Sequence, residues 1–237
     1  MTILHTQEGS TLAEHAVMAK PMTVNAARFA IASIFSGALF VLLLCILHLL
    51  QPEFDPTWRF ISEYALGSFG WMMHAAFGLL AVTQISVAIT ILPHIRTITG
   101  YIGLVILGIS AIGVIIAAVF VTDPITVGLE EATFSGRMHS IGAMLDYTPV
   151  AALLISLSLR RLDAWRPVKR VLLTSSVIAI VAMVMFVLQI PQDGQFGPGV
   201  MAGLFGRLLI LTDIAWLIIV GIHAAKLGSS LQDSSQS

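Results

Sequence analysis

The sequence predicts an all-α membrane protein, a polytopic bundle of six transmembrane helices with both termini in the cytoplasm. Three observations predict this fold class. The 237 residues are 57% hydrophobic and 11% charged, whereas soluble domains carry roughly 25% charged residues. The apolar residues fall in six blocks, each close to the about 20 residues that cross a bilayer. The Lys and Arg residues gather at one end of these blocks.

The predicted helices follow the apolar blocks in order. Residues 1–27 form a polar cytoplasmic lead, and the block that follows is far longer than the about 7–15 apolar residues of a signal peptide. We therefore expect a retained first helix, a six-helix bundle over 28–226 and a flexible cytoplasmic tail over 227–237. The six helices cover residues 29–50, 71–92, 100–121, 136–159, 168–190 and 202–225.

The distribution of positive charge predicts the orientation. With six alternating helices, nine of the twelve Lys and Arg residues share one side, including five between 160 and 170. Positive loops stay in the cytoplasm, so we expect a multi-pass protein of the plasma (cytoplasmic) membrane with both termini inside. Membrane lipids are the expected partners, and a net charge of −1 predicts no nucleic-acid partner.

Two carboxyls lie inside predicted helices, Asp146 and Asp213. Ionisable groups are costly in hydrocarbon, so such residues indicate a functional site. His139 precedes Asp146 by seven residues and shares its helix face, and Gly142 between them allows another helix or a ligand to approach closely.

The polar residues concentrate in the predicted outer half of the bundle, which indicates a polar cavity open to the outer leaflet. We expect this cavity to bind a ligand through seven residues, His48, Asp55, Ser62, Arg137, His139, Asp146 and Asp213.

Structural roles are the alternative for several of these residues. His48 would then be an interfacial histidine, and Ser62 would cap a helix end, which is a common role for serine. Asp213 would form an ion pair with Arg137 from another helix.

Three runs of the sequence carry a family resemblance. They are HLLQPEFDPTWRFISEYALGSFGW, FVTDP and GRMHSIGAMLD. Together they resemble domain of unknown function 998, a family of six-helix prokaryotic membrane proteins. The resemblance implies a six-helix bundle but no established activity. The positions it singles out are His48, Pro52, Asp55, Ile61, Ser62, Gly67, Asp123, Pro124, His139 and Asp146.

Two functions remain open from the sequence. The first is a binding protein whose cavity holds a lipid headgroup or small amphiphile, with acidic loops that favour a zwitterionic or cationic headgroup. The alternative is a metal-dependent intramembrane hydrolase acting on a lipid ester or amide, with catalytic candidates Ser62 and Glu63. Its possible zinc ligands are His74, Asp123, His139 and Asp146. A proton-coupled transporter using the two intramembrane carboxyls is a third possibility.

Overall fold

The computed structural model describes residues 24–128, 130–192 and 194–234. Six of its helical segments are long and apolar enough to cross a membrane, and none of the described residues forms a strand. The predicted all-α class and the six spans are therefore confirmed. The helices are α1 (Val24–Leu50), α2 (Gly70–Ile91), α3 (Ile98–Val119), α4 (Phe134–Met144), α5 (Thr148–Leu159), α6 (Lys169–Leu188) and α7 (Ala202–Ser234).

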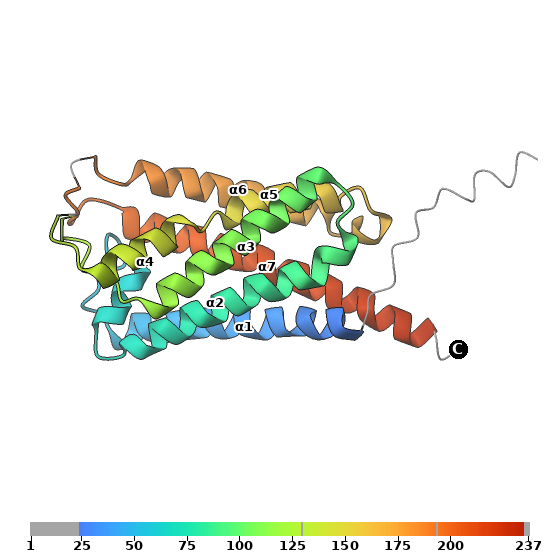
Figure 1. Ribbon diagram of the computed structural model, residues 1–237, viewed down its shortest axis with the longest axis horizontal. Coiled ribbons are helices and arrows are strands. Elements are labelled where there is room, and N and C mark those ends of the chain that lie inside the picture. The colour runs from blue at the N-terminus through green and yellow to red at the C-terminus, as the bar shows by residue number, and fades with distance from the viewer. Residues whose placement is uncertain (1–23, 129, 193, 235–237) are drawn as a thin grey trace, which may run out of the picture.

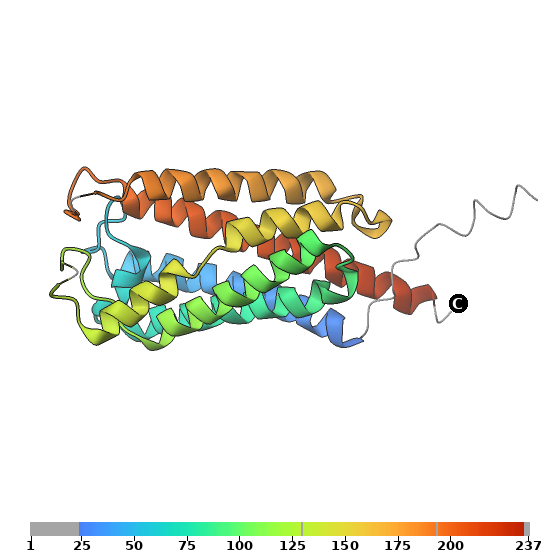
Figure 2. The ribbon, with the colours of Figure 1, turned by 45° about the horizontal axis from the view of Figure 1, so that its top comes forward.

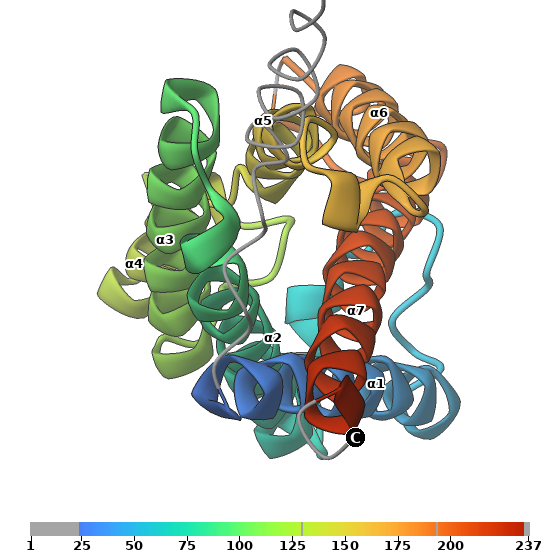
Figure 3. The ribbon, with the colours of Figure 1, turned by 90° about the vertical axis from the view of Figure 1, so that its right-hand side faces the viewer.

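The six spans lie side by side along the long axis of the bundle (Figure 1). Viewed along the bundle, α1, α2, α3, α5, α6 and α7 follow one another, and α7 returns to α1 (Figure 3). The described chain begins and ends at the same end of the bundle, as an even number of spans requires. We call this end proximal. The opposite, distal end carries the connections 51–69, 120–133 and 189–201.

Helices form in these blocks because hydrocarbon offers the backbone no hydrogen-bond partners, so every amide must be satisfied within its own segment. A helix of 22 residues such as α3 is about 33 Å long, enough for the hydrocarbon layer of roughly 30 Å. Large apolar side chains cover the outside, among them Phe35 and Leu188, while Phe40 and Met73 are fully buried inside.

One crossing brings two backbones into direct contact. Gly113 of α3 faces Gly142 of α4, and a Cβ atom added to either glycine would collide with the other's carbonyl oxygen. Small residues allow such close packing in membranes. The predicted close approach at Gly142 is thus made by α3.

The fourth predicted helix is broken into α4 and α5, which the sequence analysis did not anticipate. Pro149 lacks the N–H that would continue the helical ladder, and the Asp146 carboxylate accepts hydrogen bonds from the Thr148 backbone N and hydroxyl, at 3.2 and 2.6 Å. Beyond the break α5 packs on α6, whereas before the break α4 packs on α3 (Figure 2).

Short 3₁₀ helices lie in the connections. At the distal end Ile61–Leu66 forms one, and at the proximal end Leu92–His94 and Asp163–Trp165 form two more. The helix α7 continues to Ser234, so residues 227–234 of the expected flexible tail are helical. Residues 1–23 of the expected lead and 235–237 of the tail lie outside the described residues.

Candidate functional site

Two polar clusters lie inside the bundle. The cap cluster, at the distal end, joins α1 and α7 to the connection 51–69. The central cluster lies at the break between α4 and α5. The cap cluster consists of His48, Arg59, Glu63, Tyr64 and Arg207, and the central cluster of Gln84, Ser110, Asp146, Thr148 and Asp213.

Arg207 organises the cap cluster. Its side chain is only 7% exposed, and Nη1 donates to the carbonyl oxygens of Pro56 and Arg59 at 3.1 and 2.6 Å. Nη2 donates to the Tyr64 hydroxyl at 3.2 Å, and Nε donates to His48 Nε2 at 2.8 Å. None of these four bonds goes to a carboxylate, and three of them go to residues of the connection 51–69, so Arg207 fixes this distal connection to α7.

The bond from Arg207 determines the state of His48. A guanidinium only donates hydrogen bonds, so Nε2 of His48 accepts. The ring is then neutral, and Nδ1–H donates to the Leu44 carbonyl at 2.7 Å. Both ring nitrogens are engaged within the protein, so His48, predicted to bind a ligand, acts in the cap cluster as a structural partner.

Glu63 ties the cap cluster to the connection 120–133. Oε1 accepts from Arg59 Nη1 at 2.8 Å and from the Ile125 backbone N at 2.9 Å, and Oε2 accepts from the Phe60 backbone N at 3.0 Å. Burial raises the pKa of Glu63, although Ile125 N–H and Arg59 act in the opposite direction. Ser62 beside it is also buried. Three donors occupy the carboxylate, which is not the arrangement of a base activating a nucleophile.

Asp55 lies exposed in the same connection and forms a local turn. One of its carboxylate oxygens accepts from the Thr57 backbone N and hydroxyl, at 2.9 and 2.7 Å. The side-chain bond and then the backbone bond hold the pKa of Asp55 below its ordinary value. Aspartate commonly initiates turns in this way.

The predicted histidine ligands support the end of α3. His74 Nδ1 donates to the Ala118 carbonyl at 2.6 Å, and His139 Nδ1 lies 3.1 and 2.9 Å from the carbonyls of Ala117 and Phe120. The last carbonyls of a helix lack partners within the helix. The two histidines lie near each other and satisfy these carbonyls.

Asp123 holds Thr133, the N-cap residue of α4, instead of joining a metal site. Its carboxylate accepts from the Thr133 backbone N and hydroxyl, at 2.8 and 2.9 Å. Gly136 stands so close to this carboxylate that a Cβ there would collide with it. Among residues 24–128, 130–192 and 194–234, no three His, Cys, Asp or Glu side chains gather where they could hold a metal ion. The predicted zinc ligands His74, Asp123, His139 and Asp146 therefore do not converge.

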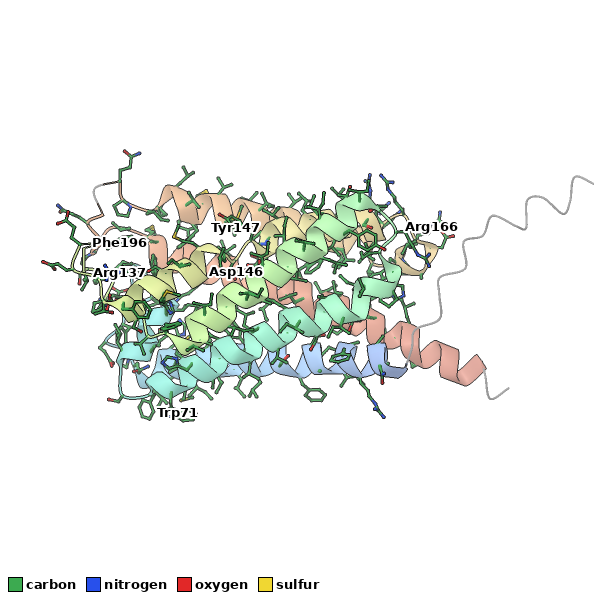
Figure 4. The ribbon with its side chains drawn as sticks, in the orientation of Figure 1. Trp71, Arg137, Asp146, Tyr147, Arg166 and Phe196 are labelled. Atoms are coloured by element: carbon green, nitrogen blue, oxygen red, sulfur yellow. The ribbon has the colours of Figure 1, made fainter. Side chains whose placement is uncertain are left out.

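Arg137 lies exposed at the distal end of α4 (Figure 4). The ion pair with Asp213 that the sequence suggested is not formed. In the part of the chain that the structure describes, the ion pair within 4.0 Å joins Arg59 to Glu63.

The central cluster surrounds Asp146, which lies about midway along the bundle (Figure 4). Gln84 Nε2 donates to the Thr148 hydroxyl at 2.9 Å and lies 3.5 Å from Asp146 Oδ1. Ser110 accepts from the Tyr147 backbone N at 2.9 Å. Side chains from α2, α3 and α5 thus replace the backbone bonds that the break removes.

Asp213 of α7 completes this cluster. It is 3% exposed, and its Oδ1 has no hydrogen-bond partner. Gln84 Oε1 is likewise buried without a partner, and Asp146 acts electrostatically on Asp213. Counted from the distal helix ends at about 1.5 Å per residue, Asp213 is about 17 Å deep, Asp146 about 18 Å and Gln84 about 21 Å.

The break is open toward the lipid. Asp146 is half-buried, whereas Met144 is 72% and Tyr147 50% exposed. A groove of about 510 Å³ lies elsewhere, on the outside of α1 and α2. Its lining is apolar and holds none of the predicted site residues, so this groove is not the polar cavity that the sequence predicted. It is lined by Ala32, Phe35, Ser36, Ala38, Leu39, Leu42 and Leu79.

Sequence reasoning missed the uncharged members of the central cluster. Gln84, Ser110 and Thr148 are single polar residues in apolar blocks, and nothing local shows which way they face. The break itself had a signal, since Asp146 precedes Pro149 by three residues, a spacing typical of a helix start.

Comparison with known proteins agrees with this architecture. A family model described as "Protein of unknown function (DUF998)" matches residues 34–223, from within α1 to within α7. No curated protein and no solved structure matches. The matched region contains four spans entirely, most of the first and last spans, and both polar clusters. The chain therefore belongs to the DUF998 family, and its six spans make it an integral membrane protein.

Proposed function

We propose that this protein binds an amphiphile with a cationic or zwitterionic headgroup, and that Asp146 and Asp213 hold the positive charge. One observation carries the proposal. Asp213 presents a buried carboxylate oxygen without a partner, beside a second carboxyl at a broken helix. Broken helices with polar residues at mid-membrane depth are typical of substrate and ion sites.

Charge supports a positive ligand. Arg207 is the basic residue of α7 on the distal side of Asp213. It donates its hydrogen bonds to His48, Tyr64 and backbone carbonyls. A buried carboxylate in a medium of low dielectric is strongly disfavoured unless a cation or proton compensates it.

Exposure supports access from the bilayer. Met144 and Tyr147 flank the half-buried Asp146 and face outward, so a headgroup can enter sideways while its chain stays in the lipid. Access through the distal connections has less support, because Arg207 and Glu63 tie these together.

The hydrolase alternative has weaker support. The carboxylate of Glu63 is taken by three donors, and His74, Asp123, His139 and Asp146 do not gather as metal ligands among the described residues.

The proposal is tested by the lipids that copurify with the protein. Wild type and Asp213→Asn are purified in parallel from the same membranes in mild detergent, and the bound lipids are quantified by mass spectrometry. The wild type should be enriched in lipids with a positively charged group, and Asp213→Asn should lose this enrichment. Asp55→Asn, which removes an exposed carboxyl, is the matched control and should keep it. Identical lipid profiles for wild type and Asp213→Asn would overturn the proposal.

We also propose that the proximal end faces the cytoplasm of a cell whose plasma membrane holds the protein. Five Lys and Arg residues between 160 and 170 lie in the connection at this end and in the first turn of α6, and positive loops remain inside. A C-terminal alkaline phosphatase fusion should be inactive. An active fusion would reverse the orientation.

A further inference from the structure

The central cluster also restricts the chemistry of the headgroup. We propose that the site selects a primary ammonium group on a single-chain or lipid amphiphile, and discriminates against a quaternary ammonium. This inference rests on the proposed function and adds the ligand class.

Both atoms of the central cluster that are buried without a partner are hydrogen-bond acceptors. Asp213 Oδ1 is a carboxylate oxygen, and Gln84 Oε1 is an amide oxygen. A buried acceptor without a partner costs roughly 1–3 kcal/mol, so a ligand that supplies donors gains at both atoms.

The orientation of the Gln84 amide follows from its neighbours. The Thr148 hydroxyl has one hydrogen, and this hydrogen goes to Asp146 Oδ1 over 2.6 Å. The hydroxyl oxygen must therefore accept from Gln84, at 2.9 Å. The nitrogen of the amide faces Thr148, which leaves Oε1 as the free acceptor. Exchanging the two amide atoms would place two acceptors against each other.

A primary ammonium matches this set. It brings one positive charge and three N–H donors, which match in number the acceptors of Asp213, Gln84 and Asp146. All three residues lie between about 17 and 21 Å from the distal helix ends.

A quaternary ammonium lacks N–H donors and is usually held by a cage of aromatic rings. The aromatic residues nearest to the two carboxyls in sequence are Tyr147, which follows Asp146, and Trp216, three residues after Asp213. Tyr147 is half exposed, and Trp216 Nε1 donates to Ser156 at 3.0 Å. Neither belongs to any of the ring–ring contacts among the described residues, which lie elsewhere in the bundle. The site thus offers acceptors and charge but no cage.

The test compares two probes with the same chain. Full-length protein in a nonionic detergent is titrated with dodecylamine and with dodecyltrimethylammonium at neutral pH, and the midpoint of thermal unfolding is measured at each concentration. We expect dodecylamine to bind about tenfold or more tightly, the effect of at least one additional hydrogen bond to a charged group. Gln84→Met, which keeps both carboxyls, should weaken dodecylamine binding and leave dodecyltrimethylammonium binding unchanged. Asp213→Asn should weaken both, and Asp55→Asn neither.

The outcomes separate this inference from the proposed function. Equal affinity for both probes, lost in Asp213→Asn, would overturn the selectivity and keep the cationic site. Absence of binding, or binding that survives Asp213→Asn, would overturn both proposals. If sodium chloride raises the midpoint of thermal unfolding more than choline chloride does, the site binds an inorganic cation, and the selectivity is also overturned. If Asp213→Asn does not fold, Gln84→Met alone decides, because selectivity unchanged in this variant contradicts the inference.

Discussion

Arg207→Met should undock the distal connection from α7. The substitution keeps an apolar stem of similar length and removes every donor. Four acceptors outside α7 lose their partner, namely His48 Nε2, the Tyr64 hydroxyl and the carbonyls of Pro56 and Arg59. Hydrogen bonds to charged groups contribute about 1.5–3 kcal/mol each, but the two carbonyls lie in a connection at the bundle end, where water can replace the arginine. At about 1 kcal/mol per acceptor, we expect a loss of about 4 kcal/mol in the free energy of unfolding.

The assay is equilibrium unfolding in mixed micelles of nonionic detergent and dodecyl sulfate, followed by tryptophan fluorescence. Arg137→Met is the matched control, because Arg137 is exposed at the same end of the bundle, and its effect should stay within about 0.5 kcal/mol. Trypsin supplies a local measurement, since the undocked connection should be cleaved faster at Arg59. If Arg207→Met is as stable as Arg137→Met and equally resistant to trypsin, Arg207 does not hold the connection.

Three further predictions concern the distal connections and the α3–α4 crossing. Burial raises the pKa of Glu63, so the folded wild type loses stability as the pH rises from the ordinary pKa of 4.5 to the raised pKa. Thermal melts of Glu63→Gln should lack this decrease of the melting temperature with pH, and an identical decrease would contradict the prediction. Gly142→Leu should collide with Gly113 and lower the free energy of unfolding by about 1–3 kcal/mol or more. In the control Gly78→Leu the new side chain enters open space. Equal elution profiles of the two variants in size-exclusion chromatography would refute the close crossing. Asp123→Ala should cost about 1 kcal/mol through the lost hydrogen bonds to Thr133, the N-cap residue of α4. It should leave the zinc content unchanged by elemental analysis, while a loss of bound zinc would revive the metal site.

The spans could be predicted from the sequence because crossing a membrane is a local property. The length and hydropathy of a segment decide it, and neither depends on what the segment packs against. All six predicted segments agree with the spans of the structure to within about four residues at each end, the range in which such boundaries are uncertain. The fourth crosses as predicted but consists of two helices.

The partners of the polar residues could not be predicted, since they come from distant parts of the chain. Arg207 could have paired with a carboxylate, and only the folded connection shows that carbonyls surround it. His139 was expected in a ligand or metal site, yet it supports the end of α3. The family resemblance singled out Asp123 and His139, and both have structural contacts at the α3–α4 junction.

The intramembrane carboxyls were recognisable because charge is rare in hydrocarbon. Asp146 and Asp213 were both identified from the sequence, and in the structure Asp146 is close enough to act electrostatically on the buried Asp213. The uncharged polar residues that surround them could not be predicted from the sequence. In α2, Gln84 provides the amide that donates a hydrogen bond to Thr148. The two residues are 64 positions apart in the sequence.

Photolabelling tests most directly whether a cationic headgroup binds at the centre of the bundle. A dodecylamine derivative with a diazirine next to the ammonium group is added to the protein in membranes and irradiated, and the labelled peptides are mapped by mass spectrometry. We predict labels beside Asp146 and Asp213, on the α4–α5 junction and α7, that unmodified dodecylamine displaces and that Asp213→Asn loses. Labels scattered over the lipid-facing sides of α1 and α6, unchanged by competitor or substitution, would contradict a central binding site.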